Sequence, residues 1–446
     1  MLEAITLLGA LIAIALLVVK PTWGIPALFI VRPLVDTQWA HPLVLGLKLT
    51  EIVSVFVPMI VLSRGAFSGD QRSSLRSLPM RGMWLWWTVN VATFSAMIAY
   101  SSGAMDGLNV FFRHVNGLAG FYMVQAYMSE DDADTRRFVW SLVLAGLFPV
   151  GTGMVEAITG HHWNTTYGED GVVRGIGLYH DAITIRYYAL QTIMGLLLLC
   201  SLYVARRRLL QAAAMVYGLA ALVVIQQAYS KAGATIVAAW ALLWPTLRRK
   251  YRQLAALCAA ALVVGAWYGT QVMSAVGFIF KREIGALEGT SAVNHAFAGR
   301  WYLWQDMLGE WQSFGILAKT FGAGHVATGA HNDYIQILFH GGLVALSVYG
   351  LLLSLTLVRI VKNLRAERGV FQSAALLAFV MWVVDTIGLV PSAYSGYQWF
   401  VWGIIGLSFR KVADGAGNLA VRSAARMQPA ARVYVPGSAE PGGLML

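Results

Sequence analysis

Long apolar runs recur along nearly the whole chain, and they constrain its fold more than any other feature. Segments such as Gln191–Val204 and Leu254–Val264 show no polar face at helical spacing. A run of about 20 apolar residues crosses the hydrocarbon core of a bilayer as one helix. Of the 446 residues, 58% are hydrophobic and only 12% are charged, whereas soluble domains carry roughly 25% charged residues. We therefore predict an all-α polytopic integral membrane protein.

The apolar runs predict about twelve transmembrane helices. They lie near residues 2–19, 43–63, 83–101, 109–127, 138–158, 181–204, 209–228, 231–246, 254–276, 341–361, 373–391 and 394–409. The stretch 22–35 is apolar but short, and it contains Pro26 and Pro33. It is either a thirteenth crossing or a broken segment lying in the interface, and the side of the N-terminus depends on which alternative holds. Met1–Val19 lacks a basic start and a cleavage site, so it reads as a retained first helix.

Basic residues gather between the runs, and their alternation predicts the orientation. The clusters are Arg64, Arg72, Arg76 and Arg81; Arg136 and Arg137; Arg206, Arg207 and Arg208; Arg248, Arg249, Lys250 and Arg252; and Arg359, Lys362, Arg365 and Arg368. Given the predicted spans, all five clusters fall on one side, which the positive-inside rule makes cytoplasmic. The net charge of +11 is therefore explained by basic loops at the surface of a lipid bilayer. We expect the bilayer, and no nucleic acid, as the partner of these residues.

The spans define one transmembrane domain over residues 1–409. Two longer loops face the opposite, outer side: Gly160–His180 and the large loop 277–339. The tail 410–446 is rich in Ala, Gly, Pro and Arg, and we expect it to be cytoplasmic and disordered. The two cysteines, Cys200 and Cys258, fall inside apolar runs and predict neither a disulfide framework nor a metal cluster.

The large outer loop contains a predicted amphipathic helix that follows Arg300. Aromatic and apolar residues recur there at spacings of three and four, namely Trp301, Trp304, Leu308 and Trp311. This pattern favours a helix over 301–314 that rests on the membrane surface. A cation at a helix start gains nothing from the helix dipole. Arg300 is therefore either an anion-holding residue or an arginine that snorkels to the interface.

Further cations lie near the same outer boundary. Arg174 ends the shorter loop, Arg186 lies about one turn inside the next helix, and Lys231 occupies the turn before another helix. Ionisable residues within a span usually face a bundle interior or a wet cavity, and Asp385 is a possible partner for any of these cations. Arginine holds phosphate oxygens in a bidentate fork. These residues therefore favour a site for a membrane-anchored anion.

His331, in the large outer loop, adds a general base to this predicted site. A lone histidine is more often structural, but the neighbouring cations favour group transfer from a lipid-linked phosphate or diphosphate to a hydroxyl. The adjacent His161 and His162 do not have structural zinc spacing. The chain also shows no Walker loop, dinucleotide fingerprint or Ser-His-Asp order. We expect neither a metal nor another cofactor.

The order of the motifs resembles the O-antigen ligase-like superfamily of bacterial envelope glycosyltransferases. This superfamily includes O-antigen ligases and the polymerases of O-antigen and exopolysaccharide. The matching motifs are His331-Asn332 followed by nine residues and Gly342, Gly299-Arg300-x3-Trp304, Gly322-x-Gly324, Arg174-Gly175-x-Gly177 and Ser230-Lys231-Ala232-Gly233. The chain departs from the family at His180-Asp181, where Pro-Asn is frequent, at Lys231, where arginine is frequent, and at Ala345, where ligases often have Gly, Thr or Val.

The resemblance implies a GT-C-type membrane fold and an inverting, metal-independent transfer in the bacterial inner membrane, with the site facing the periplasm. The donor would be a glycan on undecaprenyl diphosphate, and the acceptor another glycan or lipid A–core. Arg174 and Arg300 would hold the diphosphate, and His331 would deprotonate or orient the acceptor hydroxyl. The resemblance also makes four residues candidates for substrate binding: Asn332, Lys231, Arg186 and Trp304.

Two alternatives to a transferase stay open at this stage. A polytopic transporter or flippase of a lipid-linked glycan also places cations in a membrane, although such proteins usually carry internal repeats and sites near the midplane. A structural scaffold would tolerate the loss of Arg174 and Arg300. Within the transferase class, the departures from the family pattern favour a polymerase slightly over a ligase.

Overall fold

The computed structural model describes residues 2–44, 46–69, 73–128, 132–167, 172–204, 207–290, 300–326 and 329–409. Of these described residues, 81% are helical, and seven of their helices are long and apolar enough to cross a membrane. These findings agree with the predicted all-α membrane class. Predicted features at Arg72, Arg206, Gly299 and the tail 410–446 lie outside the described residues.

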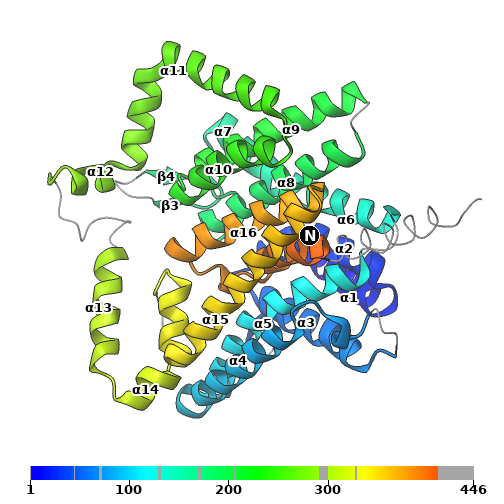
Figure 1. Ribbon diagram of the computed structural model, residues 1–446, viewed down its shortest axis with the longest axis vertical. Coiled ribbons are helices and arrows are strands. Elements are labelled where there is room, and N and C mark those ends of the chain that lie inside the picture. Colours follow the sequence, from blue (N-terminus) through cyan, green and yellow to red (C-terminus); the bar gives the residue numbers. More distant parts are fainter. Residues whose placement is uncertain are drawn as a thin grey trace, which may run out of the picture.

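Each predicted apolar run contains a helix, although several helix bounds differ from the predicted ones. The helices of the first half are α1 (Leu2–Val19), α2 (Pro21–Asp36), α3 (Leu49–Phe67), α4 (Arg81–Ser102), α5 (Ala104–Tyr127), α6 (Asp132–Ala145), α7 (Leu147–Thr159) and α8 (Ala182–Leu202). Those of the second half are α9 (Arg208–Gln227), α10 (Lys231–Leu247), α11 (Tyr251–Ile279), α12 (Lys281–Leu287), α13 (Arg300–Ser313), α14 (Ile316–Phe321), α15 (Asp333–Ala366) and α16 (Val370–Gly388). A last helix spans 395–409. Two short 3-10 turns complete the helical elements: η1 (Leu75–Ser77) lies between α3 and α4, and η4 (Pro391–Ala393) precedes the last helix. Figure 1 shows a bundle with α11 to α14 along its periphery.

Two short β-hairpins connect helices. Strand β1 (Pro42–Val44) pairs with β2 (Leu47–Lys48), and β3 (Thr166–Tyr167) pairs with β4 (Val173–Arg174), both antiparallel. The first hairpin corrects the predicted span 43–63, because α3 begins only at Leu49. Glu51 Oε2 accepts a hydrogen bond from the backbone N–H of Lys48 at 2.9 Å, which stabilises the first turn of α3 at this position.

Helix α2 runs back along α1. A Cβ added at Gly24 would overlap the backbone of Leu17, and one added at Gly9 would lie 3.3 Å from Val31. The two helices therefore form an antiparallel hairpin in which glycine permits close backbone approach. Of the two alternatives for 22–35, this packing favours a crossing over a broken interfacial segment.

The predicted span 138–158 consists of two helices, α6 and α7, which meet at Gly146. A Cβ at Gly146 would overlap the hydroxyl of Thr192 on α8, so the chain needs glycine where it approaches this neighbour. The helical stretch also begins earlier than predicted, at Asp132. Hydropathy placed the span correctly but did not reveal the interruption.

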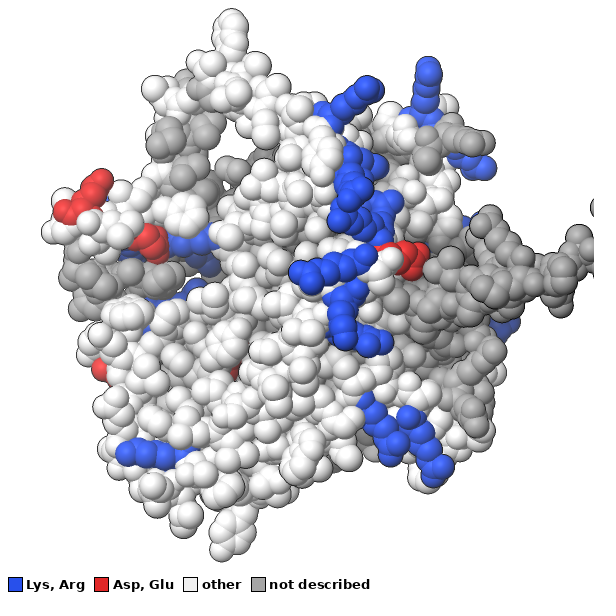
Figure 2. Space-filling model, in the orientation of Figure 1, with Lys and Arg blue, Asp and Glu red and all other residues white. Residues whose placement is uncertain are grey.

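Helix ends meet on two opposite sides of the bundle. On one side, the Arg248 guanidinium donates to the carbonyl of Arg368, and the Arg64 guanidinium donates to that of Val18. We call this the basic side, and Figure 2 shows Lys and Arg gathered in a band there, away from α12 and α13. The other side, which we call the His331 side, contains Asp181, whose Oδ2 accepts a hydrogen bond from the Tyr394 hydroxyl at 2.6 Å.

The N-terminus lies with the His331 side. Because Val18 is at the basic side, α1 begins at the opposite end of the bundle. His41 Nε2 is 3.7 Å from Glu3 Oε1, and the Trp39 ring stacks on His180 with centroids 4.3 Å apart. These contacts place the start of α1 and the end of α2 beside the shorter predicted outer loop.

Helix α15 begins at Asp333, so the predicted outer loop 277–339 ends earlier and the predicted span 341–361 begins too late. Gly342 interrupts the helix with a φ of 64° and a ψ of −163°. This left-handed value is one that glycine adopts readily. The predicted large outer loop is itself largely helical, since it contains α12, α13 and α14.

The core lies among α8, α16 and the last helix. In the most apolar 18-residue stretch of each helix, 78% of the residues are buried in α8 and 72% in α16, compared with 22% in α1 and 17% in α9. Trp399 and Phe400 of the last helix are fully buried. The peripheral helices instead turn apolar side chains outward, as helices that face lipid do.

Helix α13 matches the predicted helix after Arg300. Its Trp304 and Met307 are buried in a cluster with Ile335 and Phe339 of α15, whereas Tyr302 is 57% exposed. Protein, and not the predicted membrane surface, therefore covers the Trp304 face of this helix.

Candidate functional site

His331 projects from a tight turn whose neighbours are both fixed. Its backbone φ is +46°, a left-handed value that is uncommon for residues other than glycine, and its side chain is exposed. Before it, the carbonyl of Ala330 accepts a hydrogen bond from Trp304 Nε1 at 2.8 Å. Strained backbone that its surroundings hold in place is typical of functional sites.

Asn332 fixes the other side of this turn. Its Oδ1 accepts a hydrogen bond from the backbone N–H of Ile335 at 3.0 Å, which caps α15. Its Nδ2 donates to the carbonyl of Ile387 at 3.0 Å. Asn332 therefore ties the start of α15 to the end of α16.

Arg300, in the first turn of α13, reaches the same place. Its charge acts on His331, and a Cβ built on Gly388 would lie 3.4 Å from Arg300 Nη1. The end of α16 thus gathers Arg300, His331 and Asn332. The last carbonyls of a helix carry partial negative charge. The end of α16 therefore stabilises the positive charge of Arg300, whereas the start of its own helix α13 does not.

The site combines a neutral base with a cation. Desolvation by the protein on one side of the ring, and second the charge of Arg300, hold the pKa of the His331 imidazole below its usual value. The ring is therefore mostly neutral at pH 7 and has a lone pair with which to accept a proton. Arg300 presents N–H groups that suit phosphate oxygens.

The glycine turn Gly322-Ala323-Gly324 packs against α15 at the point where Gly342 interrupts the helix. A Cβ on Gly322, whose φ is +103°, would overlap the carbonyl of His340, and one on Gly342 would overlap the backbone of Thr320. The backbone N–H of Ala323 donates to the carbonyl of Phe339 at 3.0 Å. This bond satisfies a carbonyl close to the interruption.

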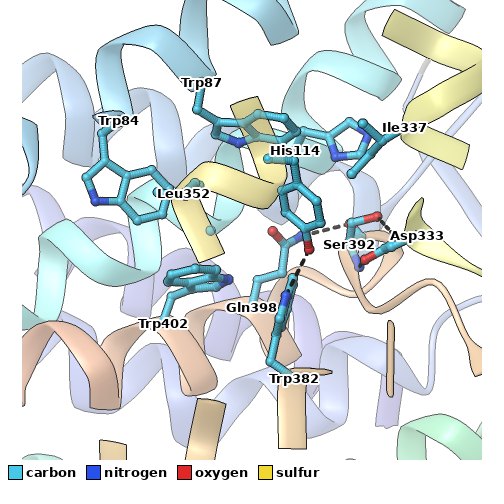
Figure 3. Close-up of a pocket in the computed structure, with 12 residues that line it drawn as sticks. Trp84, Trp87, His114, Asp333, Ile337, Leu352, Trp382, Ser392, Gln398 and Trp402 are labelled. Carbon is cyan, nitrogen blue, oxygen red and sulfur yellow. Dashed lines mark hydrogen bonds between the residues drawn. The ribbon is translucent and has the colours of Figure 1, made fainter. Parts of the chain in front are cut away.

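Asp333 anchors the start of α15 and was not among the predicted site residues. Its Oδ1 accepts a hydrogen bond from Ser392 Oγ at 2.7 Å, and Arg113 on α5 attracts its charge. Figure 3 shows Asp333 and Ser392 at a cavity of about 20 Å³ that His114 also lines. The signal was present in the sequence, because Arg113-His114 lies inside the apolar run 109–127, where ionisable residues are functional candidates.

Arg186 forms a buried ion pair. Its Nη2 is 2.7 Å from Asp385 Oδ1, and its Nη1 donates to Ser230 Oγ at 2.6 Å. The Tyr397 hydroxyl donates to Asp385 Oδ2 at 2.8 Å. The expectation that Asp385 partners one of the cations is confirmed. The pair joins α8, α16 and the last helix beneath the His331 side.

Breaking this pair from one side is expected to destabilise the fold. The Arg186→Leu variant leaves Asp385 buried without its cation, and such changes cost about 3–5 kcal/mol. The double variant Arg186→Leu/Asp385→Leu should lose less than Arg186→Leu alone, because it leaves no uncompensated charge. Thermal unfolding of the detergent-solubilised chain measures both. Simple addition of the two single losses in the double variant would contradict this expectation.

Lys231 is paired with Glu283 of α12. Its Nζ lies 2.8 Å and 2.9 Å from the two carboxylate oxygens. Ser230 caps α10 by accepting a hydrogen bond from the backbone N–H of Gly233 at 3.2 Å. These contacts tie α12 to the turn between α9 and α10. The predicted place of Lys231 in the anion site stays a prediction.

Arg174 lies on β4, in a separate loop on the His331 side. The backbone N–H of Gly175 donates to the carbonyl of Gln227 at 3.0 Å, and that of Gly177 donates to Oε2 of the buried Glu156 at 2.9 Å. Glu156 was not predicted, although an acid inside the apolar run 138–158 was a signal of this kind. The glycines that follow Arg174 therefore contact α9 and α7, whereas Arg300 lies beside His331 and the end of α16. Their joint action on one anion stays a prediction.

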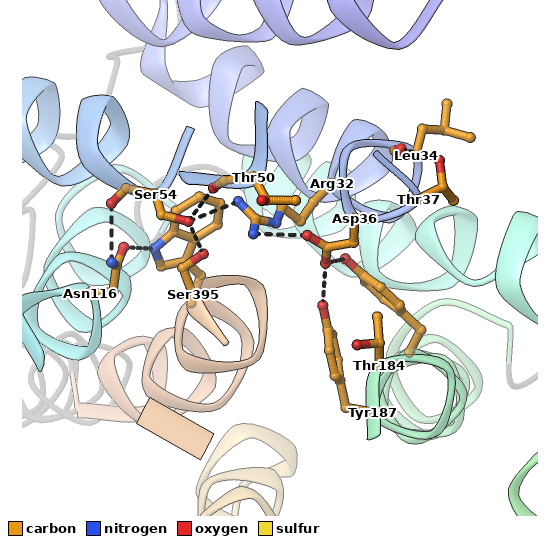
Figure 4. Close-up of polar contacts among 12 residues, drawn as sticks. Arg32, Leu34, Asp36, Thr37, Thr50, Ser54, Asn116, Thr184, Tyr187 and Ser395 are labelled. Atoms are coloured by element: carbon orange, nitrogen blue, oxygen red, sulfur yellow. Dashed lines mark hydrogen bonds and ion pairs between the residues drawn. The ribbon is translucent and has the colours of Figure 1, made fainter. Parts of the chain in front are cut away.

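A second buried arginine lies in α2. Arg32 Nη2 is 2.8 Å from Asp36 Oδ1, and its guanidinium stacks 5.2 Å from the centroid of the Trp399 ring. Asp36 Oδ2 accepts hydrogen bonds from the hydroxyls of Tyr187 and Tyr188 at 2.6 Å and 2.7 Å. Figure 4 shows this network, which holds α2 against α8 and the last helix. Arg32 was also missed, although it interrupts a short apolar stretch.

Metal ligands do not gather in the part of the chain that the structure describes, where no group of three or more His, Cys, Asp or Glu could hold an ion. The expectation that the reaction needs neither a metal nor a cofactor stays a prediction, because it concerns the reaction and its substrates as well as the protein. No protein-family model matches this chain, and no curated protein matches it.

Proposed function

We propose that this chain is a glycosyltransferase of the bacterial inner membrane that moves a glycan from undecaprenyl diphosphate to a sugar hydroxyl. The observation that carries the proposal is the meeting of Arg300 and His331 at the end of α16. The resemblance of the ordered motifs to the O-antigen ligase-like superfamily supplies the donor class. We further propose that the chain crosses the membrane about twelve times, or thirteen times if α2 is a crossing, in a GT-C-type fold whose His331 side faces the periplasm.

The two side chains divide the chemistry of an inverting transfer. His331 accepts the proton of the acceptor hydroxyl, whose oxygen attacks the anomeric carbon from the face opposite the diphosphate. The bond between that carbon and the diphosphate oxygen breaks, and undecaprenyl diphosphate leaves with the electron pair. Arg300 balances the negative charge that develops on this leaving group. Neither a metal nor a nucleotide enters the proposed reaction.

The other predicted site residues support this pair in two ways. Arg174 supplies a second cation for the diphosphate from the shorter loop on the same side. Lys231 and Arg186, which are engaged with acidic partners, hold the helix ends around the site. Asn332 and Trp304 act as positioning residues, since their hydrogen bonds fix the turn on either side of His331.

The acceptor separates two forms of this function. A polymerase extends another lipid-linked repeat unit of O-antigen or exopolysaccharide, whereas a ligase transfers the glycan to lipid A–core. We favour the polymerase, because the chain departs from the family pattern at His180-Asp181, Lys231 and Ala345. The residues that perform the transfer are the same in both.

Transfer by the purified chain tests the proposal. The chain is incubated in liposomes with a defined glycan on undecaprenyl diphosphate, a second lipid-linked glycan or lipid A–core, and a chelator, without nucleotide. We expect a longer glycan, released undecaprenyl diphosphate and an inverted anomeric centre by NMR. An unchanged donor with every acceptor contradicts the proposal. Movement of the donor across the bilayer without a new glycosidic bond favours the transporter or flippase.

The Trp304→Phe variant tests the positioning of the His331 turn. It keeps an aromatic ring in the α13–α15 cluster but removes the N–H that holds Ala330. Loss of one such hydrogen bond, worth about 1 kcal/mol, should lower kcat roughly fivefold and leave the KM for the acceptor unchanged. Steady-state kinetics measure the split, with Trp301→Phe on the same helix as the control. A raised KM at constant kcat points to direct substrate binding instead.

A further inference from the structure

An apolar cavity of about 990 Å³ lies between α8, α9, α10 and the start of α11. Its walls are mostly aliphatic and aromatic and include Leu196, Leu222 and Trp240. Met215 and Leu219, which also line it, are 65% and 57% exposed on α9, so the cavity opens sideways along the membrane-facing surface. Figure 1 shows α11 arching away from the bundle beside these helices.

The cavity is as deep as one leaflet of a bilayer. On α9 its lining runs from Gln211 to Leu222. At 1.5 Å per residue these two positions are roughly 16 Å apart along the helix, which is about half of a hydrocarbon core of ~30 Å. Its length therefore matches the acyl chains of a single leaflet and not a chain that crosses the midplane.

Polar groups line only one end of the cavity. Lys250, Gln253 and Gln211 lie at helix ends on the basic side, whereas the deeper lining is apolar. A cation at the mouth above apolar walls complements an amphipathic anion, and basic pockets between transmembrane helices on the cytoplasmic side are typical sites for anionic headgroups. Both the length and the charge point to the same occupant.

We propose that this cavity binds an anionic phospholipid of the leaflet on the basic side, with its phosphate at Lys250 and its acyl chains between α9 and α10. The site is separate from that of the glycan donor, whose diphosphate belongs to the opposite side of the bilayer. Lipid binding can therefore be tested without any transfer reaction, and its outcome is independent of the proposed function.

Native mass spectrometry of the full chain in detergent, titrated with dioleoyl phosphatidylglycerol or dioleoyl phosphatidylcholine, tests this site. We expect saturable binding of one phosphatidylglycerol and weaker binding of phosphatidylcholine. The Lys250→Gln variant should bind phosphatidylglycerol about fivefold more weakly, the effect of one surface cation. The Gly218→Phe variant should lose binding. A Cβ at Gly218 meets only Leu196 Cδ1 at 3.7 Å, so the added ring enters the cavity without a backbone clash.

Two matched variants control for charge and bulk. Arg252 is exposed in the first turn of α11, and an added Cβ at Gly151 on α7 meets no atom within 4 Å. Arg252→Gln and Gly151→Phe should both bind phosphatidylglycerol like the wild type. Equal binding of the two lipids by the wild-type chain, or unchanged binding by Lys250→Gln, overturns the proposal. The exposed Lys250 keeps this test decisive even if Gly218→Phe does not fold.

Discussion

The His331→Ala variant is expected to lower the rate of glycan transfer by roughly 10²- to 10⁴-fold, the range that a positioned general base supplies. The His331 side chain is exposed, and the hydrogen bonds that Trp304 donates to Ala330 and Asn332 donates to Ile387 hold the turn around it. Its removal therefore takes away the base without unpacking the core. The measurement is the initial rate of transfer from a defined lipid-diphosphate glycan by the purified variant.

His161→Ala is the matched control, because His161 is an exposed histidine in the shorter loop on the same side. This variant should transfer glycan at the wild-type rate. A folded and inserted His331→Ala chain that still produces full-length polymer excludes His331 as the base and favours a transporter or flippase.

The Arg300→Gln variant is expected to lose a factor on the order of 10² or more in kcat, because a preorganised charge on the leaving group acts mainly in the transition state. Arg300→Lys keeps the charge but loses the bidentate fork, so it should recover part of the rate. Lys281→Gln removes an exposed cation from α12 and should leave the rate unchanged. Equal rates for Arg300→Gln and the wild type would remove Arg300 from the reaction.

The same Arg300→Gln variant should shift the pH profile. Arg300 helps to lower the pKa of His331, so its removal raises that pKa toward the usual value. In the wild type, kcat/KM falls as the pH drops below the lowered pKa, since the imidazole then carries a proton. In Arg300→Gln this fall should begin at a higher pH, whereas Arg300→Lys should keep the wild-type profile. An acid limb that stays in place or moves to lower pH contradicts the coupling.

Apolar runs predicted the helices best where a single uninterrupted helix forms the span, as in α8, α9 and α16. Hydropathy failed at the start of α15, because Asp333, Gln336 and His340 read as loop residues although all three are buried. Polar groups are buried when partners satisfy them, and the partner of Asp333 is Ser392, far along the chain. A window of local hydropathy contains no information about such partners.

The candidate site could be predicted in its residue types and in part in its contacts. Arg300 and His331 were expected together because both belong to one outer loop with ordered motifs. Asp385 was a possible partner for several cations, and only the packing of α8 against α16 selects Arg186, which is 199 positions away. The Trp304 contact with Ala330 also depends on how α13 folds back, so the sequence could not reveal it. The role in substrate binding that the resemblance implied for Trp304 stays a prediction.

The interruption at Gly342 separates the orientation of His331 from that of the long helix that follows. In an unbroken α-helix, one inserted residue rotates everything beyond it by about 100°. The left-handed backbone at Gly342 ends that coupling, and the bonds of Asn332 and Asp333 set the short segment before it. The long segment can therefore gain or lose residues to match the thickness of a bilayer while the imidazole keeps its direction.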